Sequence, residues 1–244
     1  MHITKQKRQE QMNTKPKIKA IIFDLDGTLL DSIHDIAVSM NLALAEIGLP
    51  EYPEEDYKGF VGGGFTELVK KVLPSNKQST ANIESLKQRF WETYEVNWFL
   101  HTTPFPGILY LIQSCIARKI RLSILSNKPH YFTKKMLRNY FRGVLIKHFK
   151  NPFGIYSGEQ PDKPAKPDPT VALELAEKLG IAPEFIAFIG DSDVDIQTAK
   201  NAGMISIGAA WGYRDKAELK AAKADLIFDT PLDLVKYIES QPSI

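Results

Sequence analysis

Residues 20–32, with the sequence AIIFDLDGTLLDS, join a continuous apolar run at residues 20–24 to a turn that carries two aspartates and a glycine. Similar apolar runs recur later in the chain, at residues 121–126, 185–190, 204–208 and 225–228. Continuous rather than alternating runs are typical of strands that are buried on both faces of a parallel sheet. Because helical spacing of apolar residues lies between the runs, the pattern predicts an α/β fold with a doubly wound parallel sheet.

Two of the helical patterns carry residues that matter later. The apolar residues of 108–116 follow helical spacing, which predicts that Cys115 is a core residue. Asp168 and Pro169 are expected to open another helix, as its N-cap and its first-turn proline. Cys115 is the chain's one cysteine, so an internal disulfide and a multi-thiolate metal site are both excluded.

One long stretch breaks the alternation of strands and helices. Residues 33–103 show helical periodicity and no convincing strand, and this stretch is far longer than the usual connection between strands. It ends in Pro-Phe-Pro-Gly at residues 104–107, which we interpret as a stiff, hinge-like linker. We therefore expect three parts: a disordered basic tail at residues 1–19, an α/β core at residues 20–32 and 104–244, and an inserted helical cap domain at residues 33–103.

The charge of the chain is unevenly distributed. The formal net charge is +2, but residues 1–19 alone hold six Lys or Arg residues and one acid. Residues 20–244 therefore carry 25 basic and 28 acidic residues, a net charge of −3. Since nucleic-acid binding needs a basic surface on the folded body, we expect no nucleic-acid partner.

The chain has no sequence signal for a membrane or for export. No apolar run approaches the roughly 18 residues of a transmembrane helix, and the charged N-terminus lacks the apolar segment of a secretory signal. We expect a cytoplasmic protein with no membrane partner, either a monomer or a homodimer.

Acidic side chains follow the first predicted strand, where an open α/β sheet binds its ligands. Asp24 and Asp26 are so close that their carboxylates repel one another unless one is protonated or a cation lies between them. Such a pair can supply a nucleophile and a general acid. The alternative is an aspartate-rich turn that caps the following helix.

Polar residues also follow the later strands. Ser126 and Asn127 end the second predicted strand, and an acidic cluster with Asp191 and Asp195 follows the third. Oxygen ligands with no His or Cys nearby suit Mg²⁺ better than zinc. Lys166 lies between these segments, in a Lys-Pro-Asp-Pro sequence that begins a helix, and is favoured over Lys163 as the lysine of the site.

These motifs together resemble those of the haloacid dehalogenase superfamily of phosphohydrolases, and the resemblance covers roughly residues 20–240. It rests on DLDGT at residues 24–28, Ser126-Asn127, the lysine of Lys166-Pro-Asp-Pro, and GDSDVD at residues 190–195. The resemblance implies that Asp24 is the nucleophile that forms an aspartyl-phosphate and that Asp26 is the general acid and base.

The same resemblance implies the ligands of the site. Ser126, Asn127 and Lys166 would contact the phosphate. Mg²⁺ would be held by Asp24, the backbone carbonyl of Asp26 and Asp191, with Asp195 either ligating the ion or lying next to a ligand. The insertion would be a cap that closes over the site. The substrate would be a small phosphorylated metabolite.

Within the insertion, Gly62, Gly63 and Gly64 would let backbone approach a small substrate and present N–H groups to an anion, although a flexible turn explains them equally well. With SNKP at residues 126–129 and WGYR at residues 211–214, this segment resembles the phosphoglycolate phosphatase branch of the family, which implies 2-phosphoglycolate as substrate.

Three alternatives stay open at this point. A sugar-phosphate phosphatase and a mutase of the β-phosphoglucomutase type have the same architecture. A mutase usually needs cationic cap residues for a second phosphate, and the segment near the glycines offers three lysines, Lys58, Lys70 and Lys71. From a different class, a phospho-accepting regulatory module also pairs an acidic pocket with a lysine and Mg²⁺. The long insertion and Asp26 disfavour this last alternative.

Overall fold

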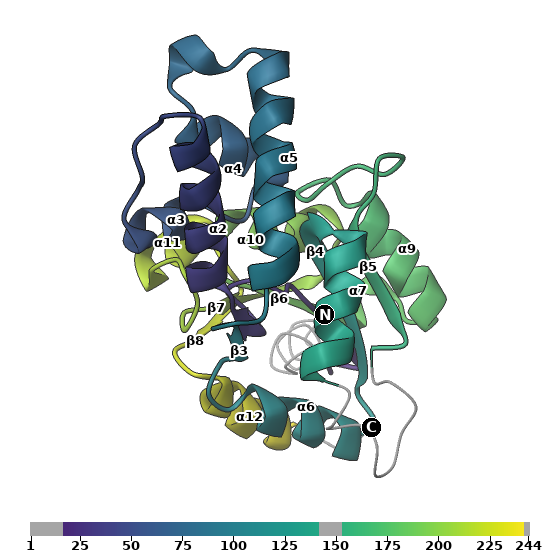
Figure 1. The fold of residues 1–244 in the computed structure, drawn as a ribbon. Helices are drawn as coiled ribbons and strands as arrows, with labels where there is room; N and C mark the ends of the chain where they lie inside the picture. Colours follow the sequence, from purple (N-terminus) through teal and green to yellow (C-terminus); the bar gives the residue numbers. More distant parts are fainter. Residues whose placement is uncertain (1–16, 142–152, 242–244) are drawn as a thin grey trace, which may run out of the picture.

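The computed structural model describes residues 17–141 and 153–241, so residues 1–16 of the expected tail lie outside the described residues. Its main sheet has six parallel strands in the order β5-β4-β1-β6-β7-β8 (Figure 1). The strands are β1 (Ala20–Phe23), β4 (Arg121–Pro129), β5 (Ile155–Glu159), β6 (Ile186–Gly190), β7 (Ile205–Ala209) and β8 (Leu226–Phe228). The predicted doubly wound α/β fold and its five strands are confirmed.

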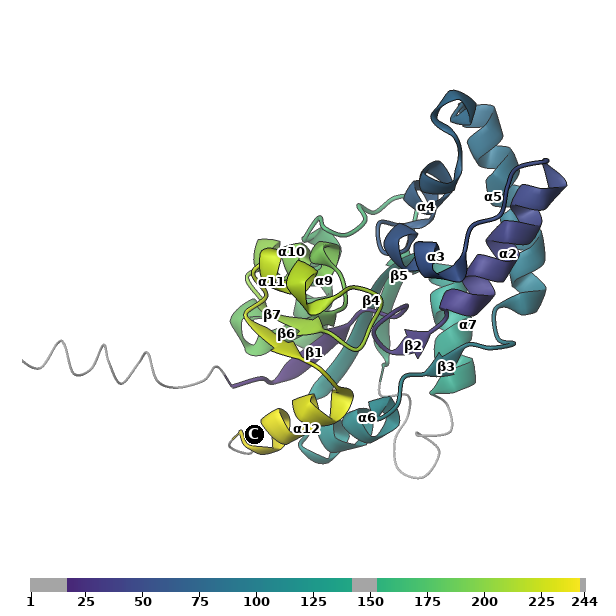
Figure 2. The ribbon, with the colours of Figure 1, turned by 90° about the vertical axis from the view of Figure 1, so that its left-hand side faces the viewer.

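Side chains of β1 alternate between two hydrophobic layers. Ala20 and Ile22 pack into one layer, and Ile21 and Phe23 into the other. The helices that cover the first face include α9 (Thr170–Leu179) and α10 (Asp193–Asn201), whereas α6 (Ile108–Ala117), α7 (His130–Tyr140) and α12 (Pro231–Glu239) cover the opposite one. Figure 2 shows α6 and α12 on one side of the sheet and α9 and α10 on the other. β1 is fully buried as a result, which explains its continuous apolar sequence.

The main sheet contains one strand, β5, that the pattern did not predict. β5 pairs in parallel with the edge of β4, and its sequence IYSGE offers only two large apolar side chains before serine and glycine. The helix predicted to open at Asp168 begins at Thr170 instead, with Pro169 at the N-cap position. Asp168 still accepts a hydrogen bond from the Thr170 N–H at 2.9 Å, so it contributes a turn rather than the cap.

The expected tail is too long by at least two residues. Ile18 is buried in the core, and the Lys19 N–H donates to the Phe185 carbonyl at 2.8 Å. The chain therefore joins the sheet before residue 20. Cys115 is buried in α6, as predicted. None of the described helices is long and apolar enough to cross a bilayer.

The insertion after β1 consists of helices at one end of the sheet (Figures 1 and 2). They are α2 (Ile33–Glu46), α3 (Glu54–Phe60), α4 (Phe65–Val72), a 3-10 turn η1 (Ser75–Lys77) and α5 (Thr80–Asn97). The two chain segments that connect them to the core pair as antiparallel strands, β2 (Leu30–Asp31) and β3 (Thr103–Pro104). Residues 33–103 are thus helical as expected, apart from Thr103 at their end. The short two-stranded sheet at the entry and exit of the insertion was not predicted, and it includes Pro104, the first residue of the expected hinge-like linker.

A buried carboxylate fixes this connection. Asp35, in the first turn of α2, accepts hydrogen bonds from the N–H groups of His101 and Thr102 and from the Thr102 hydroxyl, at 2.7–3.1 Å. Aromatic packing joins the insertion to the core as well: Trp91 of α5 stacks on Phe132 of α7, with ring centroids 4.9 Å apart. The insertion therefore contacts the core through both hydrogen bonds and packing.

Candidate active site

The first motif forms a tight turn directly after β1. The carbonyl of Leu25 accepts hydrogen bonds from the N–H groups of Leu29 and Leu30, both at 2.9 Å, which closes the turn. Gly27 has a φ of +83°, and a Cβ atom there would lie 2.3 Å from Oδ2 of Asp191. Only glycine fits this position, because the backbone is left-handed and the space is taken by a carboxylate.

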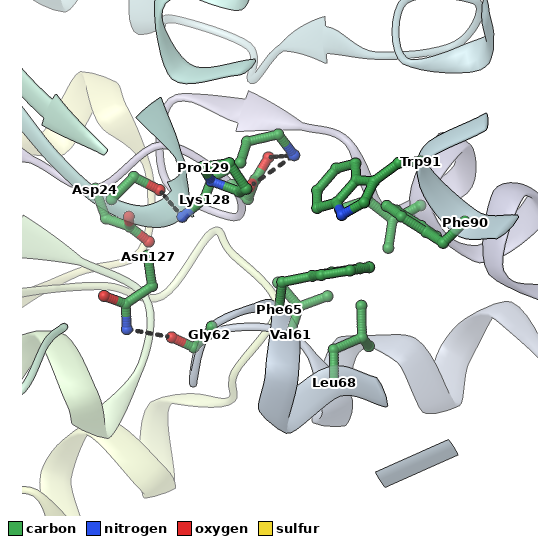
Figure 3. A pocket seen from close by; sticks show the side chains of 14 residues that line it. Asp24, Val61, Gly62, Phe65, Leu68, Phe90, Trp91, Asn127, Lys128 and Pro129 are labelled. Atoms are coloured by element: carbon green, nitrogen blue, oxygen red, sulfur yellow. Dashed lines mark hydrogen bonds and ion pairs between the residues drawn. The ribbon is translucent and has the colours of Figure 1, made fainter. Parts of the chain in front are cut away.

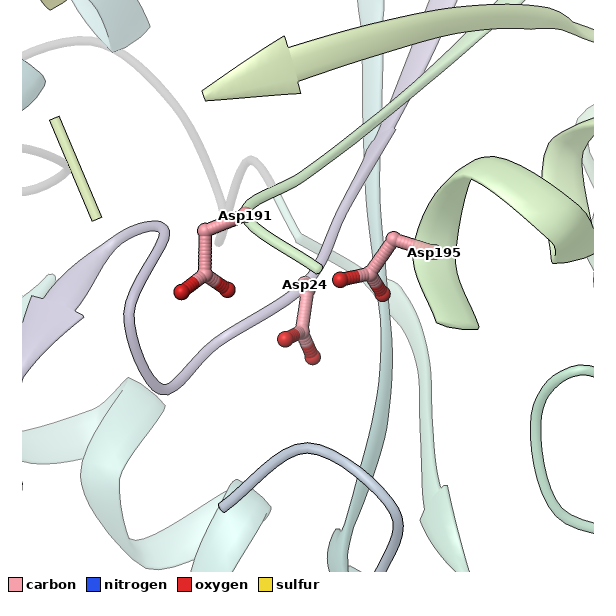
Figure 4. Close-up of side chains that lie close together, drawn as sticks. All are labelled: Asp24, Asp191 and Asp195. Atoms are coloured by element: carbon pink, nitrogen blue, oxygen red, sulfur yellow. The ribbon is translucent and has the colours of Figure 1, made fainter. Parts of the chain in front are cut away.

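Three buried carboxylates lie at the carboxyl ends of neighbouring strands. Asp24 follows β1, Asp191 follows β6, and Asp195 is in the first turn of α10; one oxygen of each lies within 4.8 Å of the others (Figure 4). Burial and the two neighbouring carboxylates raise the pKa of Asp191 well above its usual value. Buried oxygen donors whose ionised forms repel one another are the donor set that a hard divalent cation takes. The residues present therefore fit Mg²⁺.

One lysine neutralises part of this charge. Nζ of Lys166 lies 2.8 Å from Oδ1 of Asp24 and 2.6 Å from Oδ1 of Asp195. Burial lowers the pKa of Lys166, but the two carboxylates outweigh it and hold the lysine charged. Burial raises the pKa of Asp24 to about 7, against the opposing effect of Lys166. Oδ1 of Asp24 is buried, and the partner described for it is Nζ of Lys166.

Asp195 also has a structural role. Its Oδ2 atom accepts hydrogen bonds from the N–H and the hydroxyl of Ser192, at 3.1 and 2.6 Å, which forms a capping box at the start of α10. Because its other oxygen contacts Lys166, both oxygens of Asp195 already have partners. Asp193, which follows the same strand, is exposed.

Asp26 lies apart from the three-carboxylate cluster. Its side chain accepts a hydrogen bond from the Ser32 hydroxyl at 2.6 Å and forms an ion pair with Lys128, whose Nζ atom is 3.1 and 3.2 Å from the two Asp26 oxygens. Ser32 occupies the N-cap position of α2, but its side chain makes no capping hydrogen bond and contacts Asp26 instead. Any role of Asp26 in metal binding is left to its backbone carbonyl.

The two candidate phosphate-binding residues in β4, Ser126 and Asn127, form different contacts. Ser126 lines the pocket, and its hydroxyl accepts a hydrogen bond from the Lys128 N–H at 3.1 Å. The side-chain amide of Asn127 bonds to the backbone N–H and carbonyl of Lys166, at 2.9 and 3.1 Å, and to the Gly62 carbonyl at 3.1 Å. Asn127 thus positions Lys166 and the glycine segment, and its direct contact with phosphate stays a prediction.

A pocket opens between the motifs and the insertion (Figure 3). Asp24, Asp26, Ser126, Asn127 and Lys128 lie on its core side. Gly62 and Gly64 line it from the insertion, both with positive φ, whereas Gly63 is not among the residues that line it. The remaining wall is apolar and consists of Ile36, Val61, Phe65, Leu68, Phe90, Trp91 and Pro129. Trp91 packs against Phe65 and also borders this pocket.

Three residues of the WGYR segment hold the site together, and their individual roles were not predicted. The Trp211 indole donates to the Thr28 carbonyl at 2.9 Å, and the Tyr213 N–H donates to Oδ2 of Asp191 at 2.8 Å. Arg214 donates to the carbonyls of residues 58, 59 and 61 in the insertion. The motif was visible in the sequence, but its partners were not. The partners of Trp211 and Arg214 are 153 to 183 residues away, and Asp191 is 22 residues from Tyr213.

The lysines near the glycine segment are engaged elsewhere. Lys58 pairs with Glu55, and Lys70 pairs with Glu67. Lys71 donates to the Gly59 carbonyl at 2.8 Å, so it contacts the end of α3. None of the three is among the described residues that line the pocket.

Comparison with known proteins identifies the family. A model of haloacid dehalogenase-like hydrolases matches residues 21–209. The chain is 33% identical to phosphoglycolate phosphatase from Aquifex aeolicus, covering 91% of this chain and 98% of the relative. It is 31% identical to the enzyme of the same name from Mannheimia succiniciproducens, covering 91% and 99%.

Solved structures also match the fold of this chain. A haloacid dehalogenase-like family hydrolase from Streptococcus pneumoniae matches with a TM-score of 0.77 at 25% identity, covering 90% of this chain and 98% of that one. A protein from Lactobacillus delbrueckii subsp. bulgaricus matches with a TM-score of 0.82 at 29% identity, covering 91% and 98%. The chain belongs to the haloacid dehalogenase-like hydrolase family. Its enzyme class is phosphoric monoester hydrolase.

Proposed function

We propose that this chain is a Mg²⁺-dependent phosphatase that hydrolyses 2-phosphoglycolate to glycolate and phosphate through a phosphoryl group carried on Asp24. The observation that supports this most strongly is the position of Asp24. Its carboxylate lies at the end of β1, faces Lys166 at 2.8 Å and borders the pocket together with Asp26. A nucleophile, a cation and a second carboxyl group thus meet at one edge of the sheet.

In the first step, an oxygen of the Asp24 carboxylate attacks the phosphorus atom. The bond between phosphorus and the ester oxygen breaks as the bond to Asp24 forms, and Asp26 in its protonated form donates a proton to the departing oxygen. Lys166 offsets the negative charge on the transferring group. The products of this step are glycolate and an aspartyl-phosphate.

In the second step, water releases the phosphate. Asp26, now ionised, removes a proton from a water molecule, whose oxygen attacks the phosphorus atom while the bond to Asp24 breaks. Phosphate leaves, Asp24 is a carboxylate again and Asp26 is protonated again, so atoms and charges balance. The hydrogen bond from Ser32 and the ion pair with Lys128 orient Asp26 on the side of the pocket where the leaving oxygen must lie.

Asp24, Asp191 and the backbone carbonyl of Asp26 would hold Mg²⁺, with Asp195 beside them. When bound, the ion supplies electrophilic stabilisation of the phosphoryl oxygens. Asp195 also holds Lys166, whose Nζ atom lies 2.6 Å from Oδ1 of Asp195. The insertion would act as a cap, with its glycine segment close to the substrate.

The choice of 2-phosphoglycolate is supported by the curated relatives, which carry that enzyme name at about 30% identity over most of both chains. A mutase needs cations for a second phosphate. Lys58, Lys70 and Lys71 pair with residues away from the pocket, which favours a hydrolase over a mutase.

The test is a panel of phosphate monoesters assayed with Mg²⁺ and with EDTA, for the wild type and for Asp24→Asn. We expect hydrolysis that requires Mg²⁺, is abolished in Asp24→Asn and has its highest kcat/KM for 2-phosphoglycolate. Full activity in EDTA or in Asp24→Asn would contradict the mechanism. A higher kcat/KM for a sugar phosphate or a nucleotide would contradict only the substrate.

A further inference from the structure

Lys128 is a buried cation beside the second catalytic carboxyl group. Its side chain is only 6% exposed, and its Nζ atom lies 3.1 and 3.2 Å from the two oxygens of Asp26. The ring of Tyr94 packs against it, with Nζ 4.8 Å from the ring centroid. Burying a lysine this deeply is costly unless its charge has a partner, and Asp26 supplies that partner.

The surroundings of Lys128 are unusual for their lack of other cations. Of the described residues that line the pocket, Lys128 is the one basic residue, and the wall beyond it is apolar. An ammonium group has three N–H donors, and the two Asp26 oxygens account for two of them. No further acceptor for Nζ is among the hydrogen bonds of the described residues, so the third donor remains for a group that enters the pocket.

We propose that Lys128 determines specificity by binding a carboxylate on the leaving group of the substrate. This inference rests on the proposed function and names the class of substrate that the site prefers: small phosphate monoesters whose alcohol carries a carboxylate close to the ester oxygen. Neutral alcohols of the same size would lack the partner that the buried ammonium offers.

The geometry follows from the two carboxyl groups. The phosphate must lie against Asp24, and the ester oxygen must reach Asp26 in order to receive its proton. Lys128 is within 3.2 Å of that same Asp26 side chain, so it faces whatever is attached to the ester oxygen. A carboxylate separated from this oxygen by a single CH₂ group would lie next to Nζ, where it can accept a charge-assisted hydrogen bond.

Other cations near the site are already engaged. Lys166 is enclosed by Asp24 and Asp195 and does not line the pocket. Arg214 is bound to backbone carbonyls of the insertion and forms an ion pair with Glu218. Lys128 is therefore the cation that a carboxylate in this pocket would meet.

The experiment compares two esters that differ in one group. We would measure kcat/KM for 2-phosphoglycolate and for 2-hydroxyethyl phosphate, in which CH₂OH replaces the carboxylate, with the wild type, Lys128→Met and Lys128→Arg. We expect Lys128→Met to reduce the preference for the carboxylated ester by about 10- to 100-fold, the value of one buried charge-assisted hydrogen bond. Lys128→Arg keeps the charge and should restore part of the preference.

Controls keep the result interpretable. Lys134→Met removes an exposed lysine from the helix that follows β4 and should leave both esters unchanged. If Lys128→Met does not fold, as judged by thermal unfolding, the neutral polar variant Lys128→Gln takes its place. An equal loss for both esters would mean that Lys128 only orients Asp26, and it would overturn the inference.

Failure of the inference differs from failure of the proposed function. A wild type that prefers 2-phosphoglycolate, with an unchanged preference in Lys128→Met, overturns only the role of Lys128. A wild type that favours the neutral ester overturns the inference and the substrate, but leaves Asp24 as nucleophile. A wild type that hydrolyses neither ester, nor any other monoester, with Mg²⁺ overturns the proposed function and the inference together.

Discussion

Nζ of Lys166 lies 2.8 Å from Oδ1 of Asp24, and the same ammonium group contacts Asp195 at 2.6 Å. One buried cation thus forms ion pairs with two of the three clustered carboxylates. This contact holds Asp24, the proposed nucleophile, in place. A divalent cation would offset the excess negative charge left on the cluster. The function of this site therefore depends on the balance between its buried positive and negative charges as well as on its shape.

Lys166→Met tests that balance. It removes one partner of a buried ion pair, which we expect to lower the free energy of unfolding by about 3–5 kcal/mol in the presence of EDTA. We expect kcat to fall by about 100- to 1,000-fold, as for loss of one group that stabilises the transition state. Urea unfolding and steady-state kinetics with 2-phosphoglycolate measure the two effects.

Lys163→Met is the matched control for that substitution. Lys163 lies three residues earlier and pairs with Glu174 at a partly exposed position. Its removal should cost no more than about 1 kcal/mol and leave kcat unchanged. Equal effects of the two substitutions would argue against a special role for Lys166.

Stability of the metal-free protein should depend on the pKa of Asp24. Burial raises this pKa from 3.8 to about 7 in the folded state. A group whose pKa is raised on folding makes its full contribution to stability at pH values below its pKa in the unfolded state. That contribution is lost as the pH rises through its pKa in the folded state. In EDTA, wild type should therefore lose stability relative to Asp24→Asn between about pH 4 and pH 7, by a few kcal/mol.

Urea unfolding at several pH values measures this difference. Mg²⁺ requires ionised carboxylates, so it should raise stability more at pH 7.5 than at pH 5. Asp24→Asn serves as the control because it cannot titrate at this position. Parallel pH profiles for the wild type and the variant in EDTA would show that Asp24 does not titrate in this range.

Gly27→Ala should abolish activity through a steric effect. The added Cβ would lie 2.3 Å from Asp191 Oδ2, which displaces a carboxylate of the cluster. Gly203→Ala is the matched control, because its φ of +68° is also left-handed but nothing lies within 4 Å of the added atom. We expect Gly203→Ala to cost only about 1–2 kcal/mol of stability, with kcat unchanged. Similar kinetics for both variants would contradict the steric argument.

Arg214→Lys tests the contact between the core and the insertion. Arg214 bonds to three backbone carbonyls of residues 58–61, and a lysine cannot reach all of them. We expect kcat/KM to fall by about tenfold, with a loss of stability of about 1–2 kcal/mol. Arg138→Lys changes an exposed arginine of α7 and should have no effect on either. Unchanged kinetics in Arg214→Lys would show that this contact does not position the glycine segment.

Much of the core was predictable because burial leaves a simple pattern. β1 is covered on both faces, so its residues are all apolar, and Asp24 follows directly at the ligand-binding edge. β5 was missed because an edge strand with the sequence IYSGE needs fewer apolar residues. The helix start near Asp168 was predicted from local capping rules, which place boundaries only to within a few residues.

The site was predicted less completely than the fold. Strand order and motif spacing indicated that Asp24, Lys166 and Asp191 would meet at one edge. They did not indicate that Ser32 and Lys128 would both contact Asp26, since the direction in which a side chain points depends on tertiary packing. The amide of Asn127 was expected to face phosphate, but its described bonds are to backbone of Lys166 and Gly62.

Trapping of the phosphoenzyme tests the central claim most directly. Wild-type protein mixed with 2-phosphoglycolate and Mg²⁺, quenched in acid within the first turnover, should show a mass increase of one phosphoryl group by intact mass spectrometry. Peptide mapping should place that group on Asp24, and Asp24→Asn should not acquire it. Two results would contradict the account. One is a phosphoryl group on another residue. The other is rapid turnover in which rapid-quench samples never show a phosphoryl group on Asp24.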